Sequence, residues 1–167
     1  MSGAISRAPT SSPVVIAGHL LRINNGVMEE LKEDLTTMAR STAKMIIPVS
    51  ELPAHHHHKK AEEAILLAMH WIQQATLALD IQIETQQVKP EKFSMSVKQH
   101  DKLYQMKKQV DGAVAMAHHL LLNMEVPKEH LMFFNAVNQV YNELVTCSFW
   151  LDRAAGWHRM KELSRQN

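Results

Sequence analysis

Apolar residues recur every three or four positions in four long segments of the chain, and proline-bearing joints separate these segments. This spacing places the apolar side chains on one face of a helix. Joints of a few residues make consecutive helices antiparallel. The sequence therefore predicts an all-α fold, an elongated up-down-up-down four-helix bundle. The pattern is clearest in the third segment, in Leu103, Met106, Val110, Ala113, Ala117, Leu120 and Met124.

The N-terminal boundary of this bundle is set by a change in composition. Residues 1–12 are small and polar and predict a flexible tail, and residues 13–167 form the single predicted domain. Pro13 suits the first turn of helix one. The triplet Asn24-Asn25-Gly26 is a turn signal inside this helix, so a kink or a break there stays open. Apolar positions keep one register across the triplet, which favours a continuous helix.

The other helices are expected from about His56 to Gln86, from Ser96, and from near Lys128 to Leu163. Helix two is apolar on several faces, which predicts burial on all sides. The four stripes define a single core. Its expected members are Leu103, Val110, Ala117, Ile72, Leu79, Tyr141 and Leu144.

Composition restricts the classes of partner. Of 167 residues, 18 are basic and 17 acidic, so the net charge of +1 gives no general attraction to nucleic acid or acidic membranes. The basic face expected on helix three, with Lys98, Lys102 and Lys108, is interrupted by Asp101 and is read as a solvated surface. No apolar run is long enough to predict a membrane span. The 11 methionines predict an adaptable, aliphatic core.

A single cysteine, Cys147, excludes an internal disulfide and suits a reducing compartment. We therefore expect a cytoplasmic protein. Arg7, several Ser and Thr residues, and the absence of any acidic residue before Glu29 leave a mitochondrial transit peptide as the alternative.

The run His55-His56-His57-His58 is the most conspicuous polar feature. Histidines at i and i+3 share a helix face, so His55 and His58 could chelate zinc or nickel. Structural zinc needs four ligands and catalytic zinc three, and the sequence fixes no further ligand nearby. Lys59 and Lys60 also disfavour a bound cation. The run is read as a solvated joint, and an engineered insertion is a further alternative.

Cofactor motifs are absent from the sequence. A di-iron site in a helical bundle requires Glu-x-x-His on two helices, and this pattern does not occur in the chain. We therefore expect no cofactor.

The segment Arg153-Ala-Ala-Gly-Trp-His158 has the Arg-x4-His spacing of HEPN-type ribonucleases, which are also helical bundles, and resembles their motif over six residues. The resemblance implies a catalytic pair, Arg153 and His158. On a continuous helix the two side chains diverge by about 140°. The pair requires a helix break at Gly156 or a dimer, and Ala154 replaces the polar residue that usually follows the arginine.

The predicted helices carry more large apolar residues than the core stripes use. Met132, Trp150 and Trp157 share a face of helix four away from its stripe, and helix two has a similar surplus in Leu67 and Trp71. Exposed apolar rows of this kind mark interfaces. The alternative is that a tail or linker covers them.

These patterns together favour a non-enzymatic protein-interaction module, such as an assembly subunit, adaptor, chaperone-like or regulatory protein. Its expected partner is another protein or further copies of the chain, through helix four or helix two. A HEPN-like ribonuclease and a metal-binding bundle are the alternatives.

Overall fold

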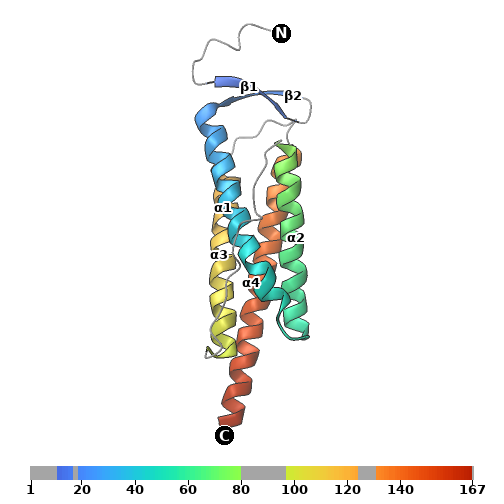
Figure 1. Ribbon diagram of the computed structural model, residues 1–167, viewed down its shortest axis with the longest axis vertical. Coiled ribbons are helices and arrows are strands. Elements are labelled where there is room, and N and C mark those ends of the chain that lie inside the picture. The colour runs from blue at the N-terminus through green and yellow to red at the C-terminus, as the bar shows by residue number, and fades with distance from the viewer. Residues whose placement is uncertain (1–10, 17–18, 80–96, 124–130, 167) are drawn as a thin grey trace.

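The computed structural model describes residues 11–16, 19–79, 97–123 and 131–166, and it places side chains from residue 30 onward within these ranges, except at 123. Within the described residues the chain forms a β-hairpin and four long helices (Figure 1). The prediction of an elongated all-α four-helix bundle is confirmed. The elements are β1 (Ser11–Ile16), β2 (His19–Asn24), α1 (Asn25–Ser50), α2 (His56–Ala78), α3 (Gln99–Asn123) and α4 (Leu131–Gln166).

The hairpin corrects the predicted start of helix one. Strands β1 and β2 pair antiparallel, with Ser11 opposite Asn24 and Ile16 opposite His19. The helix therefore begins at Asn25 and not at Pro13. The β-branched residues Val14, Val15 and Ile16 favour a strand, and asparagine is a preferred residue at a helix N-terminus. The turn signal at Asn24 thus marks a boundary between two kinds of structure.

The joint between α1 and α2 is shorter than expected. Pro48 lies in the last turn of α1, although the sequence placed it in the linker. The chain leaves the helix through hydrogen bonds from the Glu51 amide to the Ile47 carbonyl and from the Leu52 amide to the Val49 carbonyl. The linker is therefore confined to residues 51–55, which makes α1 and α2 antiparallel neighbours.

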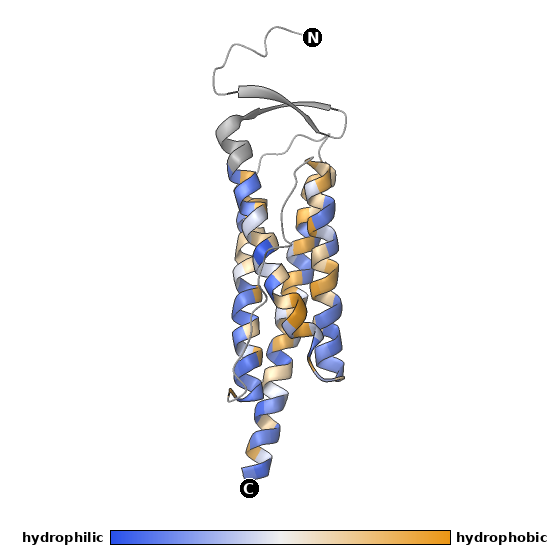
Figure 2. Cartoon of the chain, in the orientation of Figure 1, coloured by the Kyte–Doolittle hydropathy of each residue, from blue (hydrophilic) through white to orange (hydrophobic). Residues whose placement is uncertain are grey.

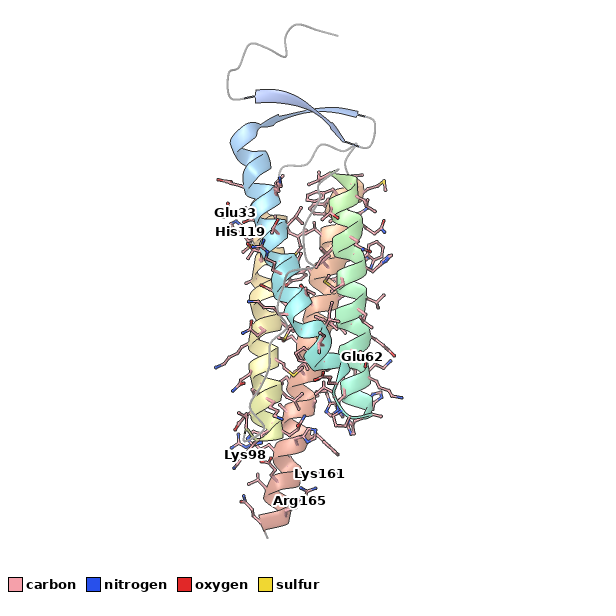
Figure 3. The ribbon with its side chains drawn as sticks, viewed as in Figure 1. Glu33, Glu62, Lys98, His119, Lys161 and Arg165 are labelled. Carbon is pink, nitrogen blue, oxygen red and sulfur yellow. The ribbon has the colours of Figure 1, made fainter. Side chains whose placement is uncertain are left out.

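Helix direction departs from the predicted alternation at α3. His100, near the start of α3, contacts Glu162, near the end of α4. His119, near the end of α3, contacts Asp34, near the start of α1, and Figure 3 shows Lys98 and His119 at opposite ends of the bundle. Helices α2 and α3 therefore run parallel. The expected end of helix two at Gln86 and the Ser96 cap lie outside the described residues.

The four helices form a square in which every adjacent pair is antiparallel. Both α2 and α3 pack against α4, and both also pack against α1. The two parallel pairs, α2 with α3 and α1 with α4, lie across the diagonals. Figure 1 shows the last turns of α4 projecting beyond the ends of α2 and α3. This projection leaves much of the C-terminal end of α4 open to solvent.

The predicted core is largely confirmed. Leu103, Ala117 and Leu144 are fully buried, and the only expected member that stays half-buried is Tyr141. At the start of α4, Phe133 is buried and Phe134 is half-buried. The core also contains Met38, Met45, Met106, Ile65, Ile72, Leu79, Val110, Val137, Val140 and Leu151.

The prediction that helix two is buried on all sides is wrong. Leu66, Leu67 and Leu77 are 48%, 46% and 71% exposed. Figure 2 shows hydrophilic residues over much of α1 and α3, whereas α2 and α4 carry more hydrophobic positions. None of the described helices has the length and hydropathy needed to cross a membrane.

A polar contact joins α3 to α4 at the edge of the apolar core. The Ser148 hydroxyl donates a hydrogen bond of 2.6 Å to Asp111 Oδ1, and Lys107 Nζ lies 2.8 Å from Asp111 Oδ2. The neighbouring Cys147 is fully buried. Burial, and then the Asp111 charge, raises the pKa of its thiol to about 12. Cys147 is therefore a packing residue and not a nucleophile.

Candidate functional site

The start of α2 and the C-terminal half of α4 bring together residues from three separate sequence hypotheses: the histidine run, the Arg-x4-His motif and the tryptophan surface. We name this group the histidine–tryptophan cluster. It consists of His55, His56, His57, His58, Trp150, Trp157 and His158.

The cluster is positioned first by the way in which α2 begins. His55 is the N-cap residue, with extended backbone, and its Nδ1 atom accepts the His57 amide at 3.2 Å. A helix N-terminus leaves amide donors without partners, and a capping side chain satisfies one of them. An imidazole here performs the role that Ser, Thr, Asp or Asn usually performs. The four histidines are therefore part of the helix start, as the interpretation of a joint between loop and helix expected, but His58 is buried and not solvated.

His58 connects α2 to α4. Its side chain is almost completely buried, with 2% exposure, and its Nδ1 atom lies 2.9 Å from the Pro53 carbonyl oxygen. The carbonyl can only accept, so Nδ1 donates and the Nε2 lone pair is left to accept. His158 Nε2 lies 3.2 Å from His58 Nε2 and donates to it. The result is an N–H···N hydrogen bond between residues 100 positions apart.

The two tryptophans are partly covered by the histidines. The Trp157 ring lies 4.2 Å from His55 between centroids, and Lys161 Nζ lies 4.4 Å from the Trp157 centroid. The Trp150 ring meets His56 edge-on at 5.3 Å. Both indoles are half-buried as a consequence. The start of α2 thus covers part of both tryptophans. This resembles the alternative in which a tail or linker covers them. Their role in binding stays a prediction.

The cluster favours uncharged histidines. Burial lowers the pKa of His158 to about 4, with further lowering by His58, His55 and Lys161 against an opposing effect of Glu162. Burial also lowers the pKa of His58, and the Pro53 carbonyl opposes that change. The pKa of His57 is lowered by burial and by the adjacent histidines. The positive end of the α2 dipole acts in the same direction. At neutral pH the N–H···N bond therefore joins two neutral rings.

This geometry does not support the alternative of a metal site at His55 and His58. Across the described ranges, no group of three or more His, Cys, Asp or Glu side chains is arranged to hold a metal ion. His55 Nδ1 caps the helix, and His58 has both ring nitrogens engaged in hydrogen bonds. A metal would have to displace these bonds and would lie beside Lys59.

The Arg-x4-His pair is also not brought together. Helix α4 continues through Gly156, so Arg153 and His158 point in different directions. The Arg153 guanidinium stacks over the Phe149 ring at 4.7 Å, on the exposed side of the helix. His158 turns toward α2. The geometry gives the ribonuclease alternative no support.

The other predicted interface residues are dispersed. Met132 is 70% exposed but lies 18 positions before Trp150, which is about 27 Å along the helix. Leu67 on α2 is exposed, whereas Trp71 packs partly against the core. The five residues therefore do not form one surface. A separate hollow of about 520 Å³ on α3, lined by Lys98, Tyr104 and Lys108, is open to solvent.

A different apolar row was missed by sequence reasoning. It lies on α4 opposite the buried stripe, and we name it the outer face. At 100° per residue its members fall within an arc of roughly 60°. The signal that could have found it is a second stripe half a turn from the first. Its members, with 41% to 68% exposure, are Val145, Phe149, Met160 and Leu163. Leu131 falls in the same arc, but the exposed Asn138 and Asn142 separate it from the row.

The two features of α4 differ in what they can do chemically. The cluster is a closed, hydrogen-bonded contact within the chain, whereas the outer face presents apolar side chains to solvent without a covering element in the described residues. No family model matches the chain, and neither a curated protein nor a solved structure matches it.

Proposed function

We propose that the chain is a non-enzymatic protein-interaction module that binds through the outer face of α4. The observation that carries the proposal is the position of exposed apolar residues on this helix. Within the part of α4 whose side chains are described, every exposed large apolar residue except Leu131 and Met132, at the start of the helix, lies on the outer face. Scattered exposed apolar residues are ordinary, but an aligned row is typical of an interface.

The composition of the outer face supports a protein partner. Phe149, Met160 and Leu163 are large side chains that lose much apolar area when covered. Phe149 also contacts Trp150, so the histidine–tryptophan cluster borders the same surface. Aromatic residues and methionine are enriched at protein interfaces. Trp150 and Trp157, which the sequence predicts at an interaction surface, would then flank the binding surface.

Compartment and partner class belong to the same proposal. A buried, unreactive Cys147 suits a reducing compartment, and we propose a cytoplasmic location. The balanced charge supports a protein partner over nucleic acid. The metal-binding and ribonuclease alternatives have no comparable geometric support.

The test compares matched serine substitutions. The double variant Phe149→Ser with Met160→Ser should abolish association in solution, measured by sedimentation velocity, because it removes two apolar side chains from the outer face. The control is Leu77→Ser with Leu122→Ser, which alters two residues of 71% and 69% exposure on other helices. Both variants should keep the helicity and melting temperature of the native chain.

The two variants separate the outcomes. Loss of association in the first and not in the second supports the outer face as the binding surface. Equal association of the first variant and the native chain, or a monomeric native chain, overturns the proposal.

A further inference from the structure

We infer that the occupant of the outer face is the outer face of a second copy of this chain, docked antiparallel with Gly156 at the two-fold axis. This inference rests on the proposed function and specifies its partner. It follows from the arrangement of Gly156, of two charged residues beside it, and of the apolar residues on either side.

Gly156 is the closest-approach point of the outer face. It lies in the same angular arc as Phe149 and Met160, and a Cβ atom added there would meet nothing within 4 Å. The glycine therefore has no packing role inside its own chain, where glycine is an unfavourable residue in a helix interior. A helix crossing over Gly156 can approach more closely than over any residue with a side chain.

Charge around Gly156 is self-complementary in one orientation. Asp152 and Arg159 are both exposed on the same flank of the outer face, and within the described ranges neither lies at ion-pair distance from an opposite charge. The pKa of Lys107 on α3 is raised by its hydrogen bond to Asp111 and further by the Asp152 charge. In an antiparallel pair centred on Gly156, Asp152 lies beside Arg159 of the second copy, and the two-fold axis repeats the pair. In a parallel pair the two-fold axis runs along the helices and places the flanks that carry Asp152 and Arg159 on opposite edges of the contact, so Asp152 does not meet Arg159 of the second copy. The pairing of Asp152 with Arg159 is therefore available only in the antiparallel dimer.

The apolar residues fit the same register. Phe149 lies seven residues before Gly156 and Leu163 lies seven residues after it. Phe149 of one copy therefore faces Leu163 of the second copy across the two-fold axis. Arg153, already stacked on Phe149, comes near Met160 of the second copy. Because the last turns of α4 project beyond α2 and α3, the second copy can lie along this surface (Figure 1). A contact between two single helices is smaller than a standard interface, so we expect a reversible dimer of roughly micromolar affinity.

Paired cysteine variants test the orientation. Phe149→Cys and Leu163→Cys chains are prepared separately and oxidised alone and as an equimolar mixture. The antiparallel dimer predicts that the mixture forms a disulfide-linked dimer of one chain of each kind, and that neither variant cross-links alone. The native Cys147 is fully buried and serves as the internal negative control. Cross-linking of each variant with itself would show a parallel pair and overturn the inference.

Charge reversal tests the register. Asp152→Arg alone and Arg159→Asp alone should each raise the dimer dissociation constant by roughly tenfold, because two attractive pairs become repulsive. The double reversal should restore native affinity. Glu63→Arg, on the exposed side of α2, is the control that should leave it unchanged. Single and double reversals with equal effects would overturn the inference.

The two proposals fail in different ways. If the serine variants on the outer face abolish association but the cysteine pairs and charge reversals do not follow the antiparallel pattern, the binding surface stands and this occupant is wrong. If the serine variants have no effect, the proposed function fails as well.

Discussion

Acidification should weaken the contact between α2 and α4, because the His58–His158 hydrogen bond needs at least one neutral ring as acceptor. His158 has a pKa of about 4 in the folded chain against an ordinary value of 6.5. As the pH falls below 6.5, the unfolded chain binds a proton at this position before the folded chain does. The stability that depends on neutral His158 is therefore complete above pH 6.5 and is lost as the pH falls toward 4.

The size of this effect follows from the shift in pKa. Each unit is worth 1.36 kcal/mol, so the full shift from 6.5 to about 4 corresponds to about 3 kcal/mol. His158 is only partly buried, and solvent screening reduces the contribution to about 1–2 kcal/mol. His57 and His58, whose pKa values are also lowered, add loss in the same direction.

The assay is urea unfolding between pH 7 and pH 4, followed by tryptophan fluorescence. A Trp71→Phe background leaves Trp150 and Trp157 as the reporters, and both contact the histidines. The variant His158→Gln keeps an amide donor for His58 but cannot bind a proton. It should keep nearly native stability at pH 7 and lose less stability on acidification.

A matched variant isolates the cluster from other histidines. His70→Gln removes an exposed histidine on α2 that is outside the cluster. The reasoning is refuted if the native chain loses no stability between pH 6.5 and pH 4. It is also refuted if His158→Gln loses as much stability on acidification as the native chain and the control His70→Gln do.

Other substitutions test the packing and the cluster. Leu144→Ala should lower the free energy of unfolding by about 2–5 kcal/mol, because Leu144 is fully buried; a loss below about 0.5 kcal/mol would contradict its place in the core. Ser148→Ala should cost about 1 kcal/mol in chemical denaturation through the lost bond to Asp111, and an unchanged midpoint would contradict that bond. The double variant Trp150→Ser with Trp157→Ser should destabilise the fold by about 2–4 kcal/mol; lost association with unchanged stability would instead identify both as interface residues. Calorimetry at neutral pH should show only weak zinc binding, and a dissociation constant in the nanomolar range would promote the metal-binding alternative.

The sequence was most informative where burial has a strict period. Leu103, Val110 and Ala117 repeat every seven residues and are all buried, because a helix presents such positions to one side. The same reasoning misread residues 13–24. Leu20 and Ile23 fit a helical stripe by spacing, whereas the β-branched run from Val14 to Ile16 and the nearby Gly18 favour a hairpin.

Contacts between distant parts of the chain could not be predicted from local sequence patterns. The antiparallel arrangement of helices two and three was predicted from a joint of a few residues, whereas residues 80–96, which lie outside the described ranges, separate α2 from α3, and a separation of that length does not require antiparallel helices. His58 and His158 form a hydrogen bond although 100 positions separate them in the sequence, and only the fold shows that their side chains meet. The outer face was in principle visible as a second stripe on helix four. The sequence interpretation instead chose the face with Trp150 and Trp157, because tryptophan is enriched at interfaces, and α2 covers that face.

The most direct test of self-association through the outer face is the mass of the chain in solution. Sedimentation equilibrium over a range of micromolar concentrations should show the native chain converting from its 19.0 kDa monomer to a dimer of twice that mass. The Phe149→Ser, Met160→Ser variant should stay monomeric throughout. A native chain that remains a 19.0 kDa monomer at the highest concentration, or a variant that still dimerises like the native chain, would contradict the account.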